Sequence, residues 1–521
     1  MARPRVLVVT GTLAKGLVES CVRGAPVDAQ VLALPRPVAA LMSCSFIAKE
    51  LKRRGVRGFD LILVPGMAMG DARLIEEGVG IRAAKGPRHA ADLPVVLEAV
   101  AEGAELSTKD PACELLRRRV EERVAALLRE LEGRVSRAGA VKVGRRRGVW
   151  VGGPVLRVFA EVLDAPLLSR EELVRAARRY REAGADVVDL GMLSEDPRPR
   201  AVRGLVRAVR RAVGPPVSVD TLDWGEVVEA LKAKADAVLS LTPSVAERAE
   251  RLLDIEGARE AAYVVVPFEP RGRRRAGAEE RVEVLLEAVG RLRRAGLRRV
   301  IADPLLDPPV APGCLEGLRA CQLLKAKAPD VPIMLGVGNV TELIDADSHG
   351  VNALLVSLAA EAGASAILTT EGSSKTRGCV EEAVRAAKMA SLAKARGAPP
   401  KDLGVDLLVV KEKRRRGVRV ELPPKVVEAS GVEEPRRDPA GSFRIGVDEE
   451  GGLLVAVHYP PGSATPDLAV VARRALEARD AIVKLGLVSD LRHAFYLGYE
   501  LAKAEVALRL RRSYVQDEDV V

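Results

Sequence analysis

The stretch GADVVDLG, residues 184–191, follows a helical pattern at 170–183 and contains a short apolar run. A glycine between a helix and a buried strand is typical of repeated α/β units, because glycine adopts the left-handed conformation that ends a helix. Similar runs recur with helical patterns between them, at 155–162, 186–190, 217–220, 237–241, 263–267, 300–303, 333–336 and 366–369. Eight strand–helix repeats in about 245 residues match a (β/α)8 TIM barrel in number and length. We therefore predict an α/β fold of the TIM-barrel type rather than a doubly wound sheet.

The segments on either side of the barrel differ from it in pattern. Residues 1–148 alternate short apolar runs with helices, which predicts an N-terminal small parallel α/β domain with a linker helix. The barrel is assigned to 149–396, and the basic, glycine-rich stretch at 143–154 is interpreted as a linker. Residues 397–521 are expected to form a C-terminal α+β domain.

Within that C-terminal domain, alternating apolar residues about a glycine-containing turn predict a hairpin at 442–459. Two helices are expected at 466–485 and 488–512, and one more strand at 402–411.

The composition excludes several classes of protein. Of 521 residues, 48% are hydrophobic and 30% charged, which argues against a disordered or low-complexity chain. No uninterrupted apolar run reaches the roughly 18 residues of a membrane span, and the N-terminus lacks a signal-peptide pattern, so we expect a cytoplasmic protein. Asparagine occurs only at Asn339 and Asn352. This scarcity, together with abundant arginine and glutamate, leads to the hypothesis of a thermophilic source.

The net charge of +10 arises from 82 basic and 72 acidic residues. Basic clusters at 145–147, 271–275 and 413–416 lie far apart, and aromatic residues are only 3% of the chain. A nucleic-acid surface normally combines concentrated charge with aromatic stacking groups, so no nucleic-acid partner is expected. The clusters are interpreted as solvated loops and helix faces, and the charge remains compatible with a small anionic substrate.

Polar residues follow the predicted barrel strands at the ends where TIM barrels build their active sites. Asp189, Asp220 and Asp303 end the second, third and sixth strands, and Asn339 follows the seventh. One such carboxylate is readily explained as a helix cap, but several facing one mouth need partners, because unpaired buried charge is costly. We therefore predict a binding site for a ligand rich in N–H donors, such as an aminopyrimidine or guanidine-like ring.

A metal centre made by the protein is not expected, because no histidine falls on these strand ends. Zinc is thereby disfavoured, whereas Mg²⁺ carried by a substrate remains open. Lys375 and Arg377 follow the eighth strand, where they are either cations at the mouth or ordinary surface charges.

Four phrases carry a family resemblance: GADVVDLG (184–191), PVSVDT (216–221), VIADP (300–304) and GVGNVTEL (336–343). In this order on a (β/α)8 barrel they resemble the pterin-binding superfamily. That family includes dihydropteroate synthases and the methyltetrahydrofolate or methyltetrahydropterin corrinoid methyltransferases. The resemblance covers about residues 150–396. With its two flanking domains, the chain resembles the archaeal dihydropteroate synthase-related proteins.

The resemblance implies roles for residues of the predicted mouth. Asp220 would hold pterin ring nitrogens, and Asp303 would bond the amino-pyrimidine edge. Asn339 matches the methyltransferase asparagine that contacts the pterin near its reacting nitrogen. The remaining pterin-binding positions would be Glu161, Asp189, Gly191 and Ser240. Glu161 stands where both branches of the family commonly carry asparagine.

The sequence departs from the synthase pattern in three loops. FAEVLDAP (159–166) replaces an LNVTPDSF-like loop, and Gly338, Asn339 and Val340 replace Ser-Arg-Lys. TTEGSSKTRG (369–378) replaces Arg-x-His. Displacement of diphosphate needs cations for the developing negative charge. Lys375 and Arg377 are the candidates for that role, and together with Asp220 and Asn339 they make up the predicted catalytic set.

Two functional hypotheses follow from the resemblance. The first is a transferase that condenses a dihydropterin diphosphate with an arylamine in folate- or methanopterin-type biosynthesis, with Mg²⁺ bound to the diphosphate. The second is a methyltetrahydropterin-dependent methyltransferase that acts with a corrinoid protein, and it is favoured by Asn339 and by the missing lysine. Its leaving amine would need a proton as it departs. The resemblance also implies a homodimer.

Overall fold

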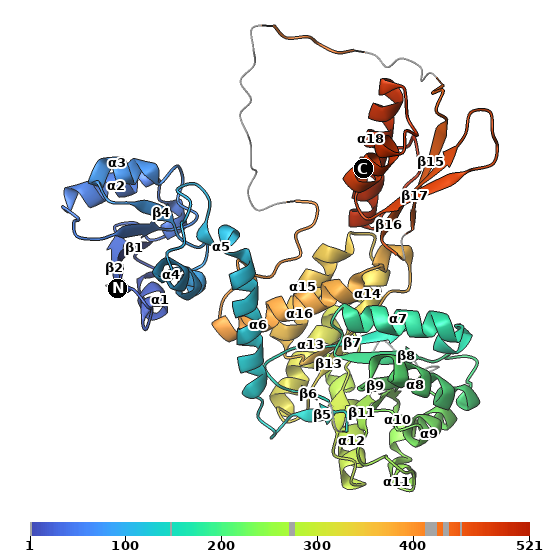
Figure 1. Cartoon of the computed structure of the whole chain (residues 1–521). Coiled ribbons are helices and arrows are strands. Elements are labelled where there is room, and N and C mark those ends of the chain that lie inside the picture. The colour runs from blue at the N-terminus through green and yellow to red at the C-terminus, as the bar shows by residue number, and fades with distance from the viewer. Residues whose placement is uncertain are drawn as a thin grey trace. The chain divides into compact units, whose positions relative to one another are not determined.

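The computed structural model describes residues 3–145, 148–269, 277–411, 425–430, 437–448 and 451–520. The chain divides into two compact units, Met1–Leu407 and Leu408–Val521 (Figure 1). Of the basic clusters noted in the sequence, 271–275 and 413–416 lie outside the described residues, as do Arg146 and Arg147. Among the residues described, no helix combines the length and apolar character that crossing a bilayer requires.

The first unit begins with a four-stranded parallel sheet, as predicted. Its strands, in the order β2-β1-β3-β4, are β1 (Arg5–Gly11), β2 (Asp28–Leu34), β3 (Leu61–Val64) and β4 (Ala83–Lys85). The helices are α1 (Lys15–Val22), α2 (Cys44–Arg53), α3 (Arg73–Val79) and α4 (Leu93–Ala101). Alternation along β1 sends Leu7 to one hydrophobic cluster and Val8 to another, so both faces of the sheet are covered.

The predicted linker at 143–154 is wrong in part. After α5 (Ala112–Leu115) and α6 (Arg117–Gly133), the chain forms a hairpin of β5 (Val141–Val143) and β6 (Val149–Val151). Val141, Val143 and Val151 pack with Phe159 and Val187 of the barrel interior. The valines thus gain apolar contacts that a solvated linker would forgo, and the hairpin closes the barrel at the end away from the strand C-termini.

The eight barrel strands are parallel and form one sheet. They are β7 (Arg157–Val162), β8 (Val187–Gly191), β9 (Val217–Asp220), β10 (Ala237–Leu241), β11 (Ala262–Val265), β12 (Val300–Ala302), β13 (Met334–Gly336) and β14 (Ala366–Thr370). A parallel bridge between Ala302 and Ile333 joins β12 to β13, so the ring closes. The predicted TIM barrel is confirmed.

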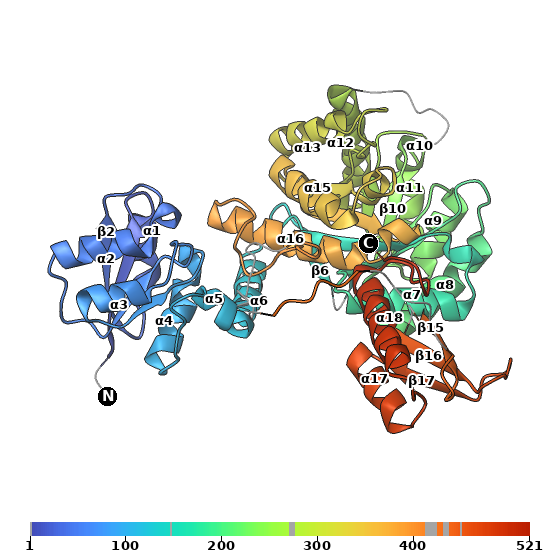
Figure 2. The same cartoon turned by 90° about the horizontal axis from the view of Figure 1, so that it is seen from above.

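Helices surround the barrel strands (Figure 2). They are α7 (Arg170–Glu182), α8 (Pro199–Val213), α9 (Trp224–Lys232), α10 (Pro243–Ala246), α11 (Ala249–Leu252), α12 (Ala278–Arg294), α13 (Leu315–Lys327), α14 (Gly338–Glu342), α15 (Ser348–Ala362) and α16 (Cys379–Arg396). Along β7, Val158 and Ala160 pack outward among the helices, whereas Phe159 packs inward. The same alternation directs Glu161 into the barrel at the C-terminal end of its strand.

The strand predicted at 402–411 does not form. Leu403 is fully buried and packs with Val124 of α6 and Leu392 of α16. Side-chain packing against two helices therefore holds this segment in place. In the described part of the segment there is no neighbouring strand that could supply the hydrogen-bond ladder of a sheet.

The second unit contains the predicted hairpin, β15 (Ser442–Asp448) and β16 (Leu453–Tyr459). The helix predicted from residue 466 is wrong at its start, because β17 (Leu468–Ala472) pairs antiparallel with β16. Val470 is buried while Val471 is half exposed, which is strand alternation rather than helical spacing. The helices are α17 (Ala475–Lys484) and α18 (Leu491–Leu510), and they complete the expected α+β arrangement.

Candidate functional site

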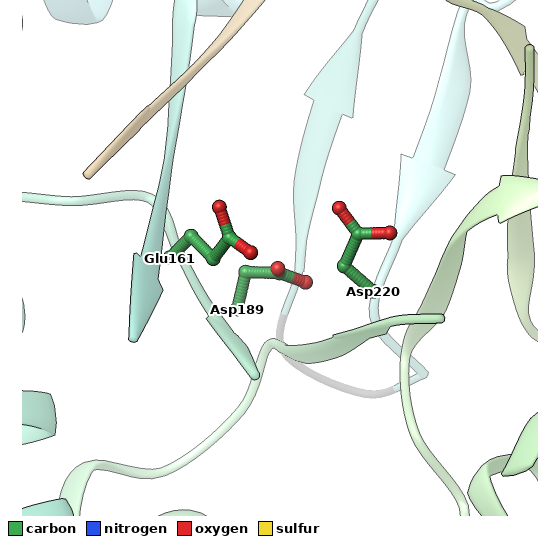
Figure 3. Close-up of side chains that lie close together, drawn as sticks. All are labelled: Glu161, Asp189 and Asp220. Carbon is green, nitrogen blue, oxygen red and sulfur yellow. The ribbon is translucent and has the colours of Figure 1, made fainter. Parts of the chain in front are cut away.

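Three carboxyl groups meet at the mouth, the end of the barrel where the strands reach their C-termini. Glu161, Asp189 and Asp220 come from the consecutive strands β7, β8 and β9, and we refer to them as the acid cluster (Figure 3). One oxygen of each lies within 4.8 Å of the others. Strand register explains the meeting, because Glu161 pairs with Asp189, and Asp220 pairs with Gly191 two residues further along β8.

Gly191 makes room for the Glu161 carboxyl group. A Cβ atom at Gly191 would lie 2.3 Å from Glu161 Oε1 and 3.1 Å from its Cδ. Such distances are far below van der Waals contact, so any side chain at this position would displace the carboxylate. Gly191 therefore lines the mouth by its lack of a side chain.

Asp189 is fully buried and only partly satisfied. The Ser218 hydroxyl donates a hydrogen bond to its Oδ1, whereas its Oδ2 has no hydrogen-bond partner among the described residues. The sequence places Ser218 at the end of the third barrel strand, within PVSVDT, but gives no role for it. Its signal was its spacing, because a residue two before Asp220 on β9 faces the same side of the sheet.

The electrostatics of the acid cluster disfavour three negative charges. Burial raises the pKa of Glu161 well above its usual range, and repulsion from Asp220 and Asp189 raises it further. Burial and the Asp220 charge likewise raise the pKa of Asp189, with the Ser218 hydrogen bond opposing them. The Asp220 pKa is raised by burial and lowered by a hydrogen bond from Ser240. Protons, an N–H-rich ligand or a cation that prefers oxygen can relieve this charge.

Ser240 reaches Asp220 through an irregular backbone. Its φ of +59° lies in the left-handed region, and the pairing of β10 with β11 shifts register between Val238 and Leu241. A bulge of this kind re-aims a side chain at a strand end. The Ser240 side chain thereby reaches Asp220 and donates a hydrogen bond to its carboxyl group.

Asp303 follows β12 and is almost fully buried. Burial raises its pKa to about 7, helped by the Asp220 charge and opposed by the backbone N–H of Leu305, which donates to Oδ1 at 2.8 Å, and by Arg281. This carboxyl group therefore changes its charge near neutral pH.

Arg281 of α12 holds the loop that carries Asp303. Its guanidinium donates to the carbonyl oxygens of Pro304 (3.1 Å) and Leu305 (2.9 Å) and pairs with Asp307 at 2.5 Å. Sequence reasoning missed this residue. The helical spacing could have indicated it, because Arg281 lies four residues before Leu285 and therefore on the buried face of an amphipathic helix.

The remaining predicted site residues lie on the loops after β13 and β14. Asn339 is exposed in the first turn of α14. Lys375 Nζ donates to the carbonyl oxygens of Glu342 (2.8 Å) and Ile344 (2.6 Å) and lies 3.7 Å from Asp345. Its ammonium group is therefore engaged by the α14 loop. Arg377 is half-buried and also has a partner within the protein.

A carboxylate reinforces the link between these two loops. Glu342 accepts hydrogen bonds from the backbone N–H groups of Gly372 (2.9 Å) and Ser373 (3.1 Å). With the Lys375 contacts, these bonds form a two-way clamp between the loops after β13 and β14. The site thus has two parts, the acid cluster with Ser240 and Asp303, and a clamped pair of loops that carries Asn339, Lys375 and Arg377.

Three family models match the chain. A model described as "Pterin binding enzyme" covers residues 163–370, within the barrel. A model described as a family of unknown function covers residues 4–88, and one described as PterinBD-DUF4346 covers residues 437–517. The barrel match includes Asp189, Asp220 and Asp303.

A curated relative matches over nearly the whole length. The uncharacterized protein MJ0107 of Methanocaldococcus jannaschii is 34% identical over 534 residues, which cover 99% of each chain. A Yersinia pestis dihydropteroate synthase structure with a pterine-sulfa conjugate is 17% identical, with a TM-score of 0.40, and covers 49% of this chain and 100% of its own. The Thermus thermophilus dihydropteroate synthase is 23% identical, with a TM-score of 0.36, over 48% and 97%. The chain belongs to the family of MJ0107, and its barrel matches the model described as "Pterin binding enzyme".

Proposed function

We propose that the protein condenses a dihydropterin diphosphate with an arylamine, in a folate- or methanopterin-type biosynthesis. The proposal rests on the pair Asp220 and Asp303, a half-buried and a buried carboxyl group at strand ends of a barrel that matches the pterin-binding enzyme model. An aminopyrimidine edge presents adjacent N–H donors, and an ionised carboxylate accepts two of them in parallel.

In the proposed reaction, the two parts of the site have different roles. Asp303 and Asp220 hold the pterin, with Ser240 orienting Asp220. The arylamine nitrogen attacks the methylene carbon of the pterin, the carbon–oxygen bond to diphosphate breaks, and the amine proton passes to water. Because the leaving diphosphate gains negative charge, it needs cations. Lys375 is engaged by two carbonyl oxygens, and Arg377 also has a partner within the protein. We therefore assign this charge mainly to Mg²⁺ bound to the diphosphate, with Arg377 as the side chain that assists it.

Methyl transfer from a methyltetrahydropterin to a corrinoid protein is the second candidate. Two observations favour it: the engagement of Lys375 by the α14 loop, and the exposed position of Asn339 at the start of α14. In this reaction the pterin amine leaves and must gain a proton. The acid cluster, whose pKa values are raised, offers carboxyl groups that hold one.

Calorimetric titration separates the two candidates. The protein is titrated with a dihydropterin diphosphate plus Mg²⁺ and, separately, with a methyltetrahydropterin. Preference for the diphosphate, with turnover lost in Arg377→Ala while pterin binding persists, supports the condensation. Preference for the methylated pterin, with no effect of Arg377→Ala, supports methyl transfer. If neither ligand binds, or if Asp303→Asn leaves the affinity unchanged, the pterin-site assignment is wrong.

A further inference from the structure

The acid cluster has the geometry of a shared cation site. One oxygen from each of Glu161, Asp189 and Asp220 lies within 4.8 Å of the other two. Oxygen ligands on opposite sides of a bound cation stand about 4 Å apart for Mg²⁺ and about 5 Å apart for Ca²⁺, and adjacent ligands are closer. Three carboxylate oxygens at these separations therefore suit a single hard divalent ion, with small adjustments of their side chains.

A second observation points to a ligand at this place. Asp189 Oδ2 is buried and has no hydrogen-bond partner among the described residues. Figure 3 shows the Asp189 carboxyl group directed toward Asp220, into the space that the three side chains share. Because a buried carboxylate oxygen without a partner is costly, an atom that completes its coordination is expected there.

The surroundings hold the ligands in position. Ser218 occupies Oδ1 of Asp189 by a hydrogen bond, which leaves Oδ2 for a cation. The absence of a side chain at Gly191 gives the Glu161 carboxyl group its space, and the backbone carbonyl of Glu161 accepts a hydrogen bond from Thr370 at 3.0 Å. Outer contacts of this kind orient metal ligands and tune their affinity.

We propose that Glu161, Asp189 and Asp220 form a resident site for one divalent cation of the Mg²⁺ or Mn²⁺ class, which the protein binds without any pterin or diphosphate. Three carboxylate ligands leave coordination positions for water or for substrate oxygens. The use of the ion, though not its binding, rests on the proposed condensation. There it would neutralise charge on diphosphate oxygens, a role that Lys375 does not take while its ammonium group is bound by loop carbonyls.

The test measures metal binding directly. Full-length protein is stripped with a chelator and titrated with Mn²⁺ in the absence of pterin, and free Mn²⁺ is followed by its electron paramagnetic resonance signal. We expect one saturable Mn²⁺ per chain, displaced by Mg²⁺. Asp189→Asn and Glu161→Gln should each weaken Mn²⁺ binding at least tenfold, the scale on which altered metal-ligand shells change affinity. Circular dichroism melting curves check that both variants are folded.

Asp303→Asn is the matched control, because it changes a buried carboxyl group of the same mouth outside the acid cluster. It should bind Mn²⁺ within twofold of the parent while losing pterin affinity. Absence of a saturable Mn²⁺ site overturns the inference, and so does binding that persists in the Glu161→Gln and Asp189→Asn double variant. A cation site with no pterin binding would instead overturn the proposed function alone.

Discussion

Asp189 in the barrel and Asp438 in the second unit are both buried carboxyl groups, yet the protein supplies them with very different numbers of hydrogen-bond donors. Asp438 accepts hydrogen bonds from the backbone N–H groups of Ala440 (2.8 Å) and Asp490 (3.0 Å) and from His493 Nδ1 (2.8 Å). The backbone N–H and hydroxyl of Ser489 complete the set. Asp189 receives one side-chain hydrogen bond and keeps an oxygen without a partner.

The two pKa values move in opposite directions. Burial alone would raise the pKa of Asp438, but hydrogen bonds from Ser489, Ala440 and Asp490 hold it well below the ordinary value. The Asp189 pKa rises well above that value. The two carboxylates therefore differ in their number of hydrogen-bond donors rather than in burial. Asp438 is fully hydrogen-bonded within the protein, whereas Asp189 keeps an oxygen that is available to a bound ligand.

The largest change in stability is expected at Asp438, whose carboxylate is fully hydrogen-bonded. Asp438→Asn should destabilise the second unit by about 3 kcal/mol, because donors arranged around a carboxylate lose an acceptor and its charge. The parent carboxylate contributes stability above the unfolded pKa near 4, which is lost as pH falls through the lower folded pKa. The penalty should therefore shrink in acid. Calorimetric melting at pH 7 and pH 3 measures it, with the exposed Asp480→Asn as the control. Equal melting temperatures of Asp438→Asn and the parent at pH 7 would contradict the comparison.

The next effect concerns the space beside the acid cluster. Gly191→Ala should weaken binding of Mn²⁺ and of the pterin by about 2 kcal/mol, roughly 30-fold, because the added methyl group displaces the Glu161 carboxyl. Gly204→Ala is the matched control, since nothing lies within 4 Å of the Cβ that it would add. Unchanged affinities in Gly191→Ala would show that the position of Glu161 does not matter.

A pH dependence follows from Asp303, whose pKa is raised to about 7. Its ionised form is the one that accepts two N–H donors, so dihydropterin affinity should rise as pH increases. Between pH 6 and pH 8 the expected gain is about tenfold, since one pKa unit corresponds to about 1.4 kcal/mol. Titration calorimetry in chelator-treated protein measures it. A flat profile is expected for Asp303→Asn, and a flat profile in the parent would refute the role of this carboxyl group.

The smallest effect is expected at Asp189, where substitution should stabilise the protein rather than destabilise it. In the presence of a chelator, Asp189→Asn should stabilise the first unit by about 1 kcal/mol at pH 8, because it removes an unsatisfied and repelled charge. A raised folded pKa means that the parent loses stability as pH rises, so the difference should vanish near pH 4. Chemical denaturation at both values measures it. Destabilisation at pH 8 would mean that the Asp189 charge is already compensated within the chain.

Much of this site was accessible from sequence because strand ends can be located without tertiary detail. Eight apolar runs imply a barrel, and a barrel places Asp189, Asp220 and Asp303 at one mouth. Arg281, the bulge at Ser240 and the hydrogen bond from Ser218 to Asp189 were missed, because hydrogen-bond partners depend on loop and side-chain geometry that periodicity does not encode.

The errors have the same origin. The sequence pattern predicts a linker where β5 and β6 form a hairpin, and a helix where β17 begins, because short elements gain most of their stability from distant neighbours. Lys375 was expected to serve the chemistry, and its contacts with the loop carbonyls could not be inferred from local pattern. Its role in catalysis remains a prediction.

The clamp between the loops after β13 and β14 has a consequence for how this protein can diversify. Lys375 donates to main-chain carbonyl oxygens. Glu342 accepts from main-chain N–H groups and from the hydroxyls of Ser373 and Thr376, so the frame depends on these few side chains. Neighbouring positions such as Asn339 and Ile344 are thereby free to vary in sequence while the backbone path persists. Descendants of this chain can therefore exchange the side chains that the mouth presents while the barrel strands keep their geometry.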